Sequence, residues 1–317
     1  EFRRVLFRSW LEDEGRVSFP WSMIDKITPH PSERVQEELG RLGVADMAIA
    51  RTNTGTLIAP FVNAEITEYL VLEDAFPNGR PALEGAGVYL TDRTTVEKAE
   101  KMKVGTCLNP LHTALAVYGC LLGYTSIAAE MGDADLKALV EHIAAESLPV
   151  VEDPGILSPR AFIDEVLHER FPNPAIPDTP QRIAADTSQK LPVRYGGTLR
   201  RYARQSEQAL AGLEFAPLVF AGWCRYLLGV DDRGNAMPVS PDPMLPQLQA
   251  HLKGIEVGRP DSLAGQLRPI LSNAALFGVD LYAAGLGERT EEMFRDMLAG
   301  PGAVRATLHR NCVCKQP

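Results

Sequence analysis

The spacing of hydrophobic and polar residues predicts strands in the first part of the chain. Short runs rich in β-branched and aromatic residues, at 66–72 and 87–90, are bounded by Pro, Gly and Asp, a pattern typical of strands. The segment 18–31 begins with an extended aromatic run and ends in a proline-containing loop, which indicates a strand that leads into a loop. Because a helix is also expected at 32–42, this part of the chain is predicted to be α/β.

From residue 93 onward the pattern changes to helical spacing, and no further strand is expected. Asn109-Pro110 is typical of a helix N-cap followed by proline at the first helical position, and Ser158-Pro159 and Thr179-Pro180 repeat this signal. Apolar residues at helical spacing follow Asn109 and predict a buried helix. The expected fold class is therefore mainly α, with a helical domain at 93–317 after an α/β region at 10–92.

Residues 1–9, EFRRVLFRS, do not match the sequence that follows. We expect them to be a non-native segment, such as a translated cloning scar, and leave them out of the fold prediction. On this interpretation the natural sequence begins near Trp10, and the chain is the later part of a longer protein.

Composition and charge narrow the expected class of protein. The chain has 45% hydrophobic residues and a net charge of −9, with no basic stripe that carries interleaved aromatics, which argues against a nucleic-acid partner. No apolar run has the length of a membrane span and no signal peptide is present, so a cytoplasmic protein is expected. The five cysteines are expected to be free thiols. Cys312 and Cys314 with His309 could hold a metal, but a loose tail is the favoured interpretation, and no metal is expected.

Three polar residues near the start of the predicted buried helix suit the removal of hydride from a secondary alcohol. A neutral Lys103 can accept the hydroxyl proton as a general base. Asn109 can donate to the oxygen on which charge develops, and His112, on the same helix face, can hold the substrate hydroxyl. Each residue also has a structural interpretation, as a solvated lysine, a helix cap and a buried core histidine. Taken singly, those structural interpretations are favoured.

Two cations further along the chain can bind a substrate. Arg182 and Lys190 stand eight residues apart, so on one continuous helix their side chains point to within about 80° of each other. They can hold a polyhydroxy or carboxylate compound. The alternative is an i, i+4 ladder of Arg182, Asp186 and Lys190 on a solvated face. Asp25 likewise is either a site residue at a strand end or part of a surface turn.

Five segments, taken in order, resemble the mannitol dehydrogenase family of polyol-specific long-chain dehydrogenases: SFPWSMIDKITP, LVLEDAF, KVGTCLNPLH, RFPNPAIPDTPQRIAADTSQK and GWCRYLLGVDDRG. The resemblance implies that 10–92 is the C-terminal remnant of a Rossmann domain. It implies that 93–317 is a helical domain of the 6-phosphogluconate dehydrogenase C-terminal type. It also implies NAD as cofactor, a sugar acid or polyol as substrate, and no need for metal.

The resemblance also implies roles for six residues. It places the family's base lysine, oxyanion asparagine and substrate histidine on Lys103, Asn109 and His112. It places the substrate-binding arginine and lysine, and the aspartate of the strand-end motif, on Arg182, Lys190 and Asp25.

The chain departs from the family pattern in two ways. The family's lysine stands five residues before the asparagine, whereas Lys103 stands six before Asn109. An unbroken helix would turn Lys103 about 180° from His112, so a one-residue bulge near Gly105 is expected. Lys101 would be in phase without a bulge and remains the alternative base. The glycine-rich dinucleotide motif is also absent from the chain, so this fragment is expected to be a poor enzyme or inactive.

Within the family, the segments TCLNPLHTALA and IPDTPQRIAADTSQK look closest to the fructuronate reductase branch, which interconverts D-fructuronate and D-mannonate. Mannitol 2-dehydrogenase and tagaturonate reductase are alternatives within the family. A helical interaction module without activity is the alternative from another class of protein. The sequence leaves open the substrate stereochemistry, the choice of NAD or NADP and the oligomeric state.

Overall fold

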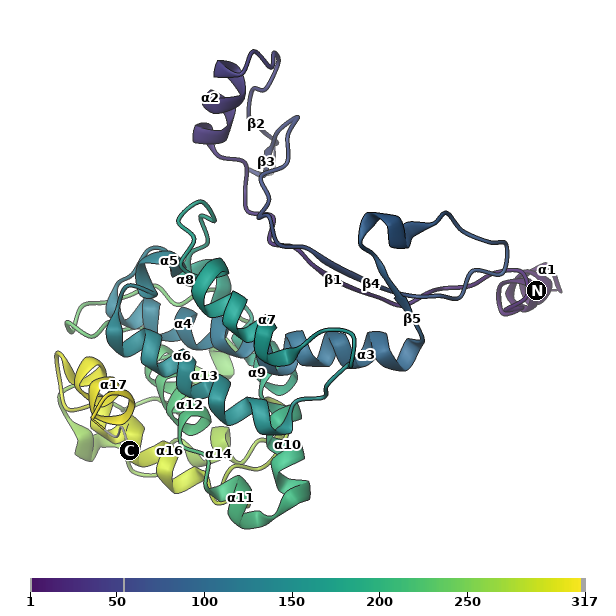
Figure 1. Ribbon diagram of the computed structural model, residues 1–317. Helices are drawn as coiled ribbons and strands as arrows, with labels where there is room; N and C mark the ends of the chain where they lie inside the picture. The colour runs from purple at the N-terminus through teal and green to yellow at the C-terminus, as the bar shows by residue number, and fades with distance from the viewer. Residues whose placement is uncertain (1, 54, 315–317) are drawn as a thin grey trace. The chain divides into compact units, whose positions relative to one another are not determined.

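The chain divides into two compact units in a computed structural model that describes residues 2–53 and 55–314 (Figure 1). One comprises Glu1–Met102 and Glu152–Ser158 and is called the sheet unit; the other comprises Lys103–Val151 and Pro159–Pro317 and is called the helical unit. Glu1 of the predicted scar and residues 315–317 of the predicted helical domain lie outside the described residues. Within the described ranges, every strand ends by Thr91, which confirms the mainly α class and the change of pattern near residue 93.

The described residues of the sheet unit form two small sheets and three α-helices. The first sheet has the order β1-β4-β5, formed by β1 (Ser22–Asp25), β4 (Tyr69–Glu73) and β5 (Tyr89–Thr91). β1 is antiparallel to β4, and β5 is parallel to it. The second, antiparallel sheet pairs β2 (Ala50–Arg51) with β3 (Leu57–Ile58). The helices are α1 (Phe2–Leu11), α2 (Glu33–Arg41) and α3 (Arg93–Met102), and a 3-10 turn lies at Leu83–Ala86.

The predicted elements of this unit lie close to the observed ones. The strands expected at 66–72 and 87–90 are β4 and β5, shifted by one to three residues. The helix expected at 32–42 is α2, capped by the Ser32 hydroxyl, which accepts the N–H of Val35. The two-residue strands β2 and β3 were not predicted, because a pair of residues is too short to show a period.

One face of the first sheet is covered by α3. Met23 and Val71 point from β1 and β4 toward Val96 and Ala99 of the helix, and all four are buried. Ile24, on the opposite face of β1, is 62% exposed. Because α3 packs on this sheet, the two units divide after Met102, ten residues beyond the boundary predicted at 92/93.

The helical unit consists of fourteen described α-helices and short connecting turns. The helices are α4 (Asn109–Leu122), α5 (Ile127–Glu130), α6 (Ala134–Ser147), α7 (Pro159–Glu165), α8 (Pro180–Ile183), α9 (Thr187–Arg194), α10 (Gly196–Gln205), α11 (Glu207–Ala211), α12 (Phe215–Tyr226), α13 (Leu245–His251), α14 (Arg268–Leu271), α15 (Ala274–Phe277), α16 (Gly287–Met297) and α17 (Ala303–Cys312). Two π-helices lie at Lys103–Cys107 and Val166–Arg170, and 3-10 turns at Leu148–Val150 and Pro260–Ser262.

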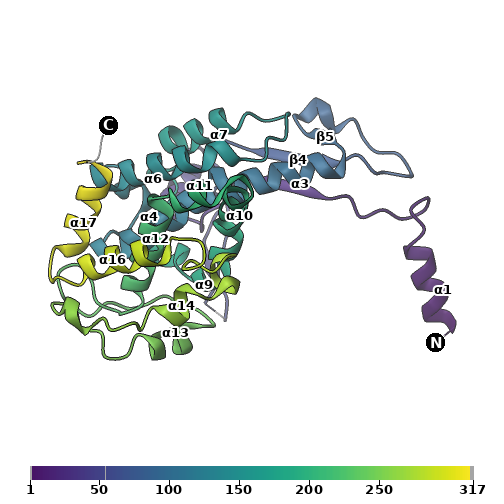
Figure 2. The same ribbon diagram turned by 90° about the horizontal axis from the view of Figure 1, so that it is seen from below.

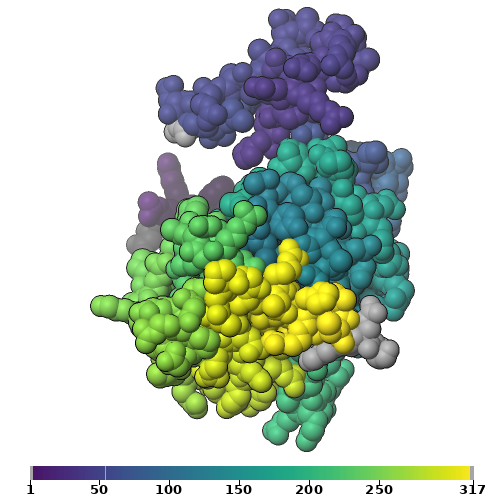
Figure 3. All heavy atoms as spheres, turned by 90° about the vertical axis from the view of Figure 1, so that its left-hand side faces the viewer, coloured from purple at the N-terminus to yellow at the C-terminus, as the bar shows by residue number. Residues whose placement is uncertain are grey.

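Helices α4 and α12 form the interior of the helical unit (Figures 1 and 2). They pack closely because Gly222 of α12 lies against the ring of Tyr118; a Cβ at Gly222 would lie 2.5 Å from that ring. The Tyr118 hydroxyl donates to the carbonyl of Leu218 at 2.7 Å. α16 packs on α12, and α16 and α17, yellow in Figure 3, form part of one face of this unit.

A loose tail was expected at the C-terminal cysteines, and the structure differs from this expectation. Cys312 is buried as the last residue of α17, and Cys314 is exposed. His309 is engaged with Asp135, because Nδ1 lies 2.9 Å from the carboxylate oxygen Oδ1. The part of the chain that the structure describes contains no group of three His, Cys, Asp or Glu side chains arranged for a metal ion, and no helix there is long and apolar enough to cross a membrane.

Candidate active site

The chain leaves α-helical geometry directly before α4. In the π-helix Lys103–Cys107, the N–H of Leu108 donates at 3.1 Å to the carbonyl of Lys103, five residues earlier. A π-turn holds one residue more than an α-turn, so it rotates the preceding side chains by about 100° relative to the following ones. This is the bulge near Gly105 that the lysine spacing predicted. It reduces the angle between Lys103 and His112 from about 180° to about 80°.

The two candidate base lysines have different surroundings. Lys103 is the first residue of the π-helix and is half-buried. Lys101 is 46% exposed and forms ion pairs with Glu97 at 2.9 Å and Glu152 at 3.7 Å. Lys103 therefore remains the predicted base.

Asn109 lies one position further into its helix than expected. Leu108 is the N-cap residue and Asn109 the first helical residue, because the π-helix leads the chain directly into α4. The cap interpretation of Asn109 is therefore wrong. Its carbonyl accepts from the Thr113 hydroxyl at 2.9 Å, and its side-chain amide makes no hydrogen bond to another described residue, which leaves the amide available to a ligand.

His112 lies one turn into α4, with its ring nearly buried. The ring packs on Phe171, with 5.1 Å between centroids, and Nε2 lies 3.5 Å from Oδ2 of Asp178. Burial lowers the pKa of His112 to about 3, although the Asp178 carboxylate opposes the shift. The imidazole is therefore neutral at physiological pH.

Three cations of α8 and α9 lie around His112. The charges of Arg194, Arg182 and Lys190 all lower the pKa of this histidine. Both helices pack on α4. The structure thus brings Arg182 and Lys190 near the predicted histidine and adds Arg194 to the group.

Arg182 and Lys190 do not lie on one continuous helix, which corrects the prediction. α8 ends at Ile183 and α9 begins at Thr187. Between them Asp186 adopts a left-handed conformation, with φ of 53°, and its N–H donates to the carbonyl of Pro241 at 2.8 Å. This contact comes from a distant part of the sequence, so it overrides the helical pattern.

The surface ladder is also wrong. Lys190 Nζ donates to the carbonyls of Ile183, at 2.9 Å, and Ala185, and so closes the break between the two helices. Burial and the nearby Arg194 lower the pKa of Lys190. In the described ranges, no ion pair links Asp186 with Arg182 or Lys190.

Arg182 is instead held by Asp178, four residues before it. Nε donates to Oδ1 at 2.7 Å and Nη2 to Oδ2 at 2.6 Å, which is a bidentate pair. These hydrogen bonds raise the pKa of Arg182. The carboxylate of Asp178 is buried, whereas the Arg182 side chain is 56% exposed, so the outer edge of its guanidinium faces solvent.

Asp178 and Arg194 were not predicted from the sequence. Nη1 of Arg194 donates to the hydroxyl of Thr113 at 2.6 Å and lies 3.5 Å from the carbonyl of Asn109. Burial lowers the pKa of Arg194 to about 10. Both missed residues continue the four-residue spacing of Arg182, Asp186 and Lys190, one before it and one after it, which was the available signal.

Asp25 ends strand β1 of the sheet unit and is 3% exposed. The surface-turn interpretation is therefore wrong, because Lys26 pairs with Glu68 at 2.7 Å while Asp25 is buried. Its role in a substrate site remains a prediction.

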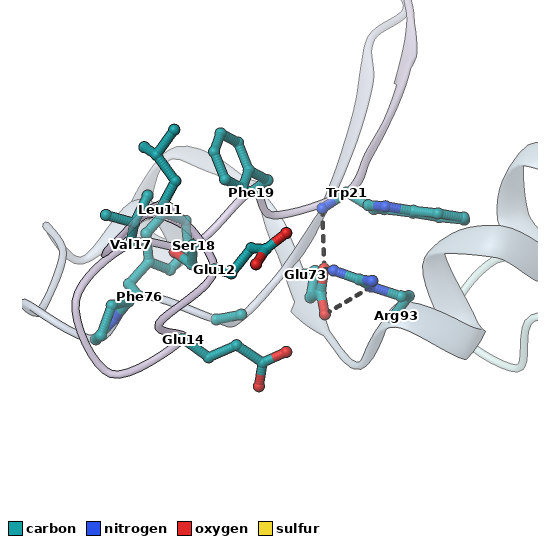
Figure 4. Close-up of a pocket in the computed structure, with 12 residues that line it drawn as sticks. Leu11, Glu12, Glu14, Val17, Ser18, Phe19, Trp21, Glu73, Phe76 and Arg93 are labelled. Atoms are coloured by element: carbon teal, nitrogen blue, oxygen red, sulfur yellow. Dashed lines mark hydrogen bonds and ion pairs between the residues drawn. The ribbon is translucent and has the colours of Figure 1, made fainter. Parts of the chain in front are cut away.

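The sheet unit also has an open pocket, and Glu73 lines one side of it beside Trp21 and Arg93 (Figure 4). The carboxylate accepts the N–H of Trp21 and the Nε of Arg93, both at 3.0 Å, and the hydrogen bond from Arg93 lowers the pKa of Glu73. The Arg93 guanidinium lies over the Trp21 ring, 5.0 Å from its centroid. None of the predicted site residues lines this pocket.

Residues 95–290 match the family model of the mannitol dehydrogenase C-terminal domain. Among curated proteins, the D-mannonate oxidoreductase of Thermotoga maritima is 57% identical over 304 residues, which are 95% of this chain and 56% of that protein. The mannitol 2-dehydrogenase of Aspergillus niger is 32% identical over 293 residues, 86% of this chain and 50% of that protein. The chain thus spans about half the length of the curated relatives it matches.

Solved structures match over nearly the whole chain. The ternary complex of Pseudomonas fluorescens mannitol 2-dehydrogenase with NAD and D-mannitol has a TM-score of 0.75 and 29% sequence identity, and the match covers 99% of this chain and 57% of that one. A substrate-free D-sorbitol dehydrogenase matches with a TM-score of 0.74 at 24% identity, over 97% of this chain and 57% of that one. At that identity the second match shows the fold alone.

Proposed function

Since the chain belongs to the mannitol dehydrogenase C-terminal domain family, we propose that it forms the substrate-binding and proton-transfer part of an NAD-dependent oxidoreductase that interconverts D-fructuronate and D-mannonate. The observation that carries this proposal is the group of Arg182, Lys190 and Arg194 around a neutral His112 at the start of α4. The relative at 57% identity is a D-mannonate oxidoreductase, which favours a sugar acid as the substrate.

The proposed proton transfer uses the first residue of the π-helix and the first residue of α4. Lys103, in its neutral form, takes the proton of the hydroxyl that is oxidised and returns it in the reverse reaction. The side-chain amide of Asn109 donates to the same oxygen as negative charge develops on it. The π-helix supports this pairing, because it turns Lys103 toward the face of α4 that carries His112.

Substrate binding uses the charged side chains of α8 and α9. The exposed edge of the Arg182 guanidinium can form a planar pair with the carboxylate of a sugar acid, and Lys190 adds a second positive charge. A cluster of cations in a protein with a net charge of −9 favours an anionic substrate over a neutral polyol at this position.

NAD is proposed as the cofactor because the similar mannitol 2-dehydrogenase structure contains NAD. α3 directly follows strand β5, but its N-terminus is occupied by Asp92, whose carboxylate accepts the N–H of Thr95 at 3.0 Å. This helix therefore does not offer the open N–H groups that bind a pyrophosphate. We propose that the cofactor phosphates are bound outside the described residues, that 10–92 is the end of a Rossmann domain, and that Asp25 adds a substrate contact.

Calorimetry with this chain tests the substrate. D-mannonate should bind and D-mannitol should bind more weakly, because only the acid carries a carboxylate. Arg182→Gln should weaken D-mannonate binding by about tenfold or more, from the loss of a charged hydrogen-bonded pair. Arg204→Gln, at an exposed position of α10, is the matched control and should leave binding unchanged. Equal binding of the two compounds favours mannitol 2-dehydrogenase, and no binding of either favours the helical interaction module.

Kinetics test the base. In a preparation that oxidises D-mannonate with NAD, Lys103→Ala should lower kcat by about 100-fold or more, the usual contribution of a general base. Lys101→Ala should leave kcat near the wild-type value. A loss of kcat in the Lys101 variant alone would transfer the role to Lys101.

A further inference from the structure

Asp178 lies between two of the proposed substrate-binding side chains. One carboxylate oxygen, Oδ2, accepts from Nη2 of Arg182 at 2.6 Å and lies 3.5 Å from Nε2 of His112. The other oxygen, Oδ1, accepts from Nε of Arg182 at 2.7 Å and from the N–H of Thr179 at 2.9 Å. The single buried carboxylate of Asp178 therefore lies next to both side chains, Arg182 and His112.

The backbone holds this carboxylate in a fixed place. The N–H of Asp178 donates to the carbonyl of Ile176 at 2.8 Å, and its carbonyl accepts the N–H of Ile127 at 3.0 Å. The residue directly follows the proline-rich loop at 171–177 and is 4% exposed. Its position is thus set by α5 and the loop, independently of any ligand.

A neutral imidazole carries one proton, and its neighbours decide which nitrogen holds it. The negative charge beside Nε2 of His112 favours the proton on that nitrogen. Nδ1 is then a hydrogen-bond acceptor, and it makes no hydrogen bond to another described residue. In this form His112 accepts a hydrogen bond from a substrate hydroxyl group, which both the hydroxy acid and the keto sugar acid of the proposed reaction carry.

The same carboxylate sets the direction of Arg182. The inner edge of the Arg182 guanidinium, Nε and one Nη2 hydrogen, is bound to Asp178, so the Nη1 side remains for a ligand. The guanidinium is planar, so holding one edge fixes the other.

The geometry points to Asp178 as a positioning residue, which fixes the Nε2–H form of His112 and turns the free edge of Arg182 toward the substrate. The consequence for substrate binding rests on the proposed function. The assignment of the proton on His112 does not, because it depends only on groups within the helical unit.

Nitrogen-15 NMR of the imidazole rings in this chain at pH 7 tests the proposal. The signal of His112 is identified by its loss in His112→Gln. The wild-type chain should show a protonated Nε2 and an unprotonated Nδ1. In Asp178→Asn, the side-chain amide can donate to Nε2, so the proton should move to Nδ1 in part or in full. Asp186→Asn is the matched control, since it makes the same chemical change without a contact to the ring, and should keep the wild-type pattern.

The possible results test the role of Asp178 and the proposed function separately. An Nδ1–H form in the wild-type chain, or an unchanged pattern in a folded Asp178→Asn, overturns the role of Asp178. If the NMR result is as expected, D-mannonate should also bind Asp178→Asn about tenfold or more weakly. The expected NMR pattern with no binding of D-mannonate to the wild type contradicts the proposed function alone.

Discussion

The two units of this protein differ in how completely they bury their large hydrophobic side chains. In the described part of the chain, the large exposed hydrophobic side chains belong to the sheet unit, Val193 excepted. Phe19, Ile24 and Ile66 are more than half exposed there. In the helical unit, α4 and α12 are buried on nearly all sides. The helical unit therefore contains its own core, whereas the main sheet is covered on one face, by α3.

A complete core can also bury charge, as the helical unit does with Arg225. This side chain is fully buried and donates to the carbonyls of Met297 at 3.2 Å, Val230 at 2.6 Å and Asp231 at 3.2 Å. Each of the three guanidinium nitrogens donates to a carbonyl, which offsets part of the cost of burial. The sheet unit also buries charged groups, Asp25 and Glu65, but its described residues include no buried arginine or lysine.

The largest effect is expected for Arg225→Ala. The change removes the hydrogen bonds from Arg225 to three carbonyls, of which only that of Asp231 keeps another donor in the described structure, the N–H of Gly234, and it opens a cavity. We therefore expect the free energy of unfolding to fall by about 4 kcal/mol. Urea denaturation followed by far-ultraviolet circular dichroism measures it. Arg233→Ala, an exposed neighbour, should change the free energy by less than about 0.5 kcal/mol. A loss below about 1 kcal/mol at Arg225 would show that the helical core does not depend on this residue.

Glu130 is a buried acid of the helical unit without such partners. Neither carboxyl oxygen has a hydrogen-bond partner in the described structure. Gly119 makes room for it, since a Cβ there would lie 2.0 Å from Oε1. Burial raises the pKa of Glu130 to about 9, so the group is neutral at physiological pH.

The next largest effect is therefore expected for the pH dependence of Glu130→Gln. An acid whose pKa rises on folding binds more protons in the folded state, so stability is full below pH 4.5 and is lost as pH rises toward 9. At pH 7 this loss is about 3 kcal/mol. Glu130→Gln should remove it and flatten the stability between pH 5 and pH 8 in urea denaturation. Glu141→Gln, on the exposed side of α6, should keep the wild-type slope; the same slope in both variants would contradict a buried neutral Glu130.

A smaller and more local effect is expected for Val71→Ala. Val71 is fully buried under α3, and its truncation should cost the sheet unit about 2 kcal/mol. Hydrogen exchange followed by mass spectrometry should show faster exchange in peptides from β1, β4 and α3, and no change in α4 or α12. Equal acceleration in both units would show that they unfold as one.

The smallest effect is expected for Ile24→Lys. Ile24 is on the uncovered face of the sheet, so the free energy of unfolding should change by less than about 0.5 kcal/mol. Self-association, measured by light scattering, should fall because the change places a charge on an apolar face. Met23→Lys, one position earlier and 2% exposed, should instead unfold the sheet. Similar results for the two variants would contradict the difference in burial between the two faces of the sheet.

The predictable parts of this fold are those set by local sequence. The strands β4 and β5, helix α2 and the helical pattern after Thr91 follow from periodicity and caps. The π-helix could be predicted because Lys103 stands six residues before Asn109, one more than in the family that the chain resembles. The break between α8 and α9 could not, because Asp186 is held by the carbonyl of Pro241.

The candidate site likewise has residues that were predicted from the sequence and partners of those residues that were not. Asn109, His112, Arg182 and Lys190 were predicted as site residues, and this role stays a prediction, although Arg182 and Lys190 do lie near enough to His112 to lower its pKa. Their partners were not predicted, because a buried carboxylate such as Asp178 acquires its importance from the groups that surround it after folding. The sequence shows the four-residue spacing that contains Asp178, but that spacing equally fits a solvated surface.

The π-helix at Lys103–Cys107 has a consequence for how related genes are compared. One additional codon in a regular helix would rotate all preceding side chains by about 100° relative to the following ones, and would disturb the packing of one end. Here a single turn absorbs the extra residue, so α3 keeps its contacts with the sheet while α4 keeps its buried surface. An alignment of this chain with relatives of shorter spacing should therefore place its one-residue gap inside this turn, and a gap placed elsewhere would pair the wrong lysines.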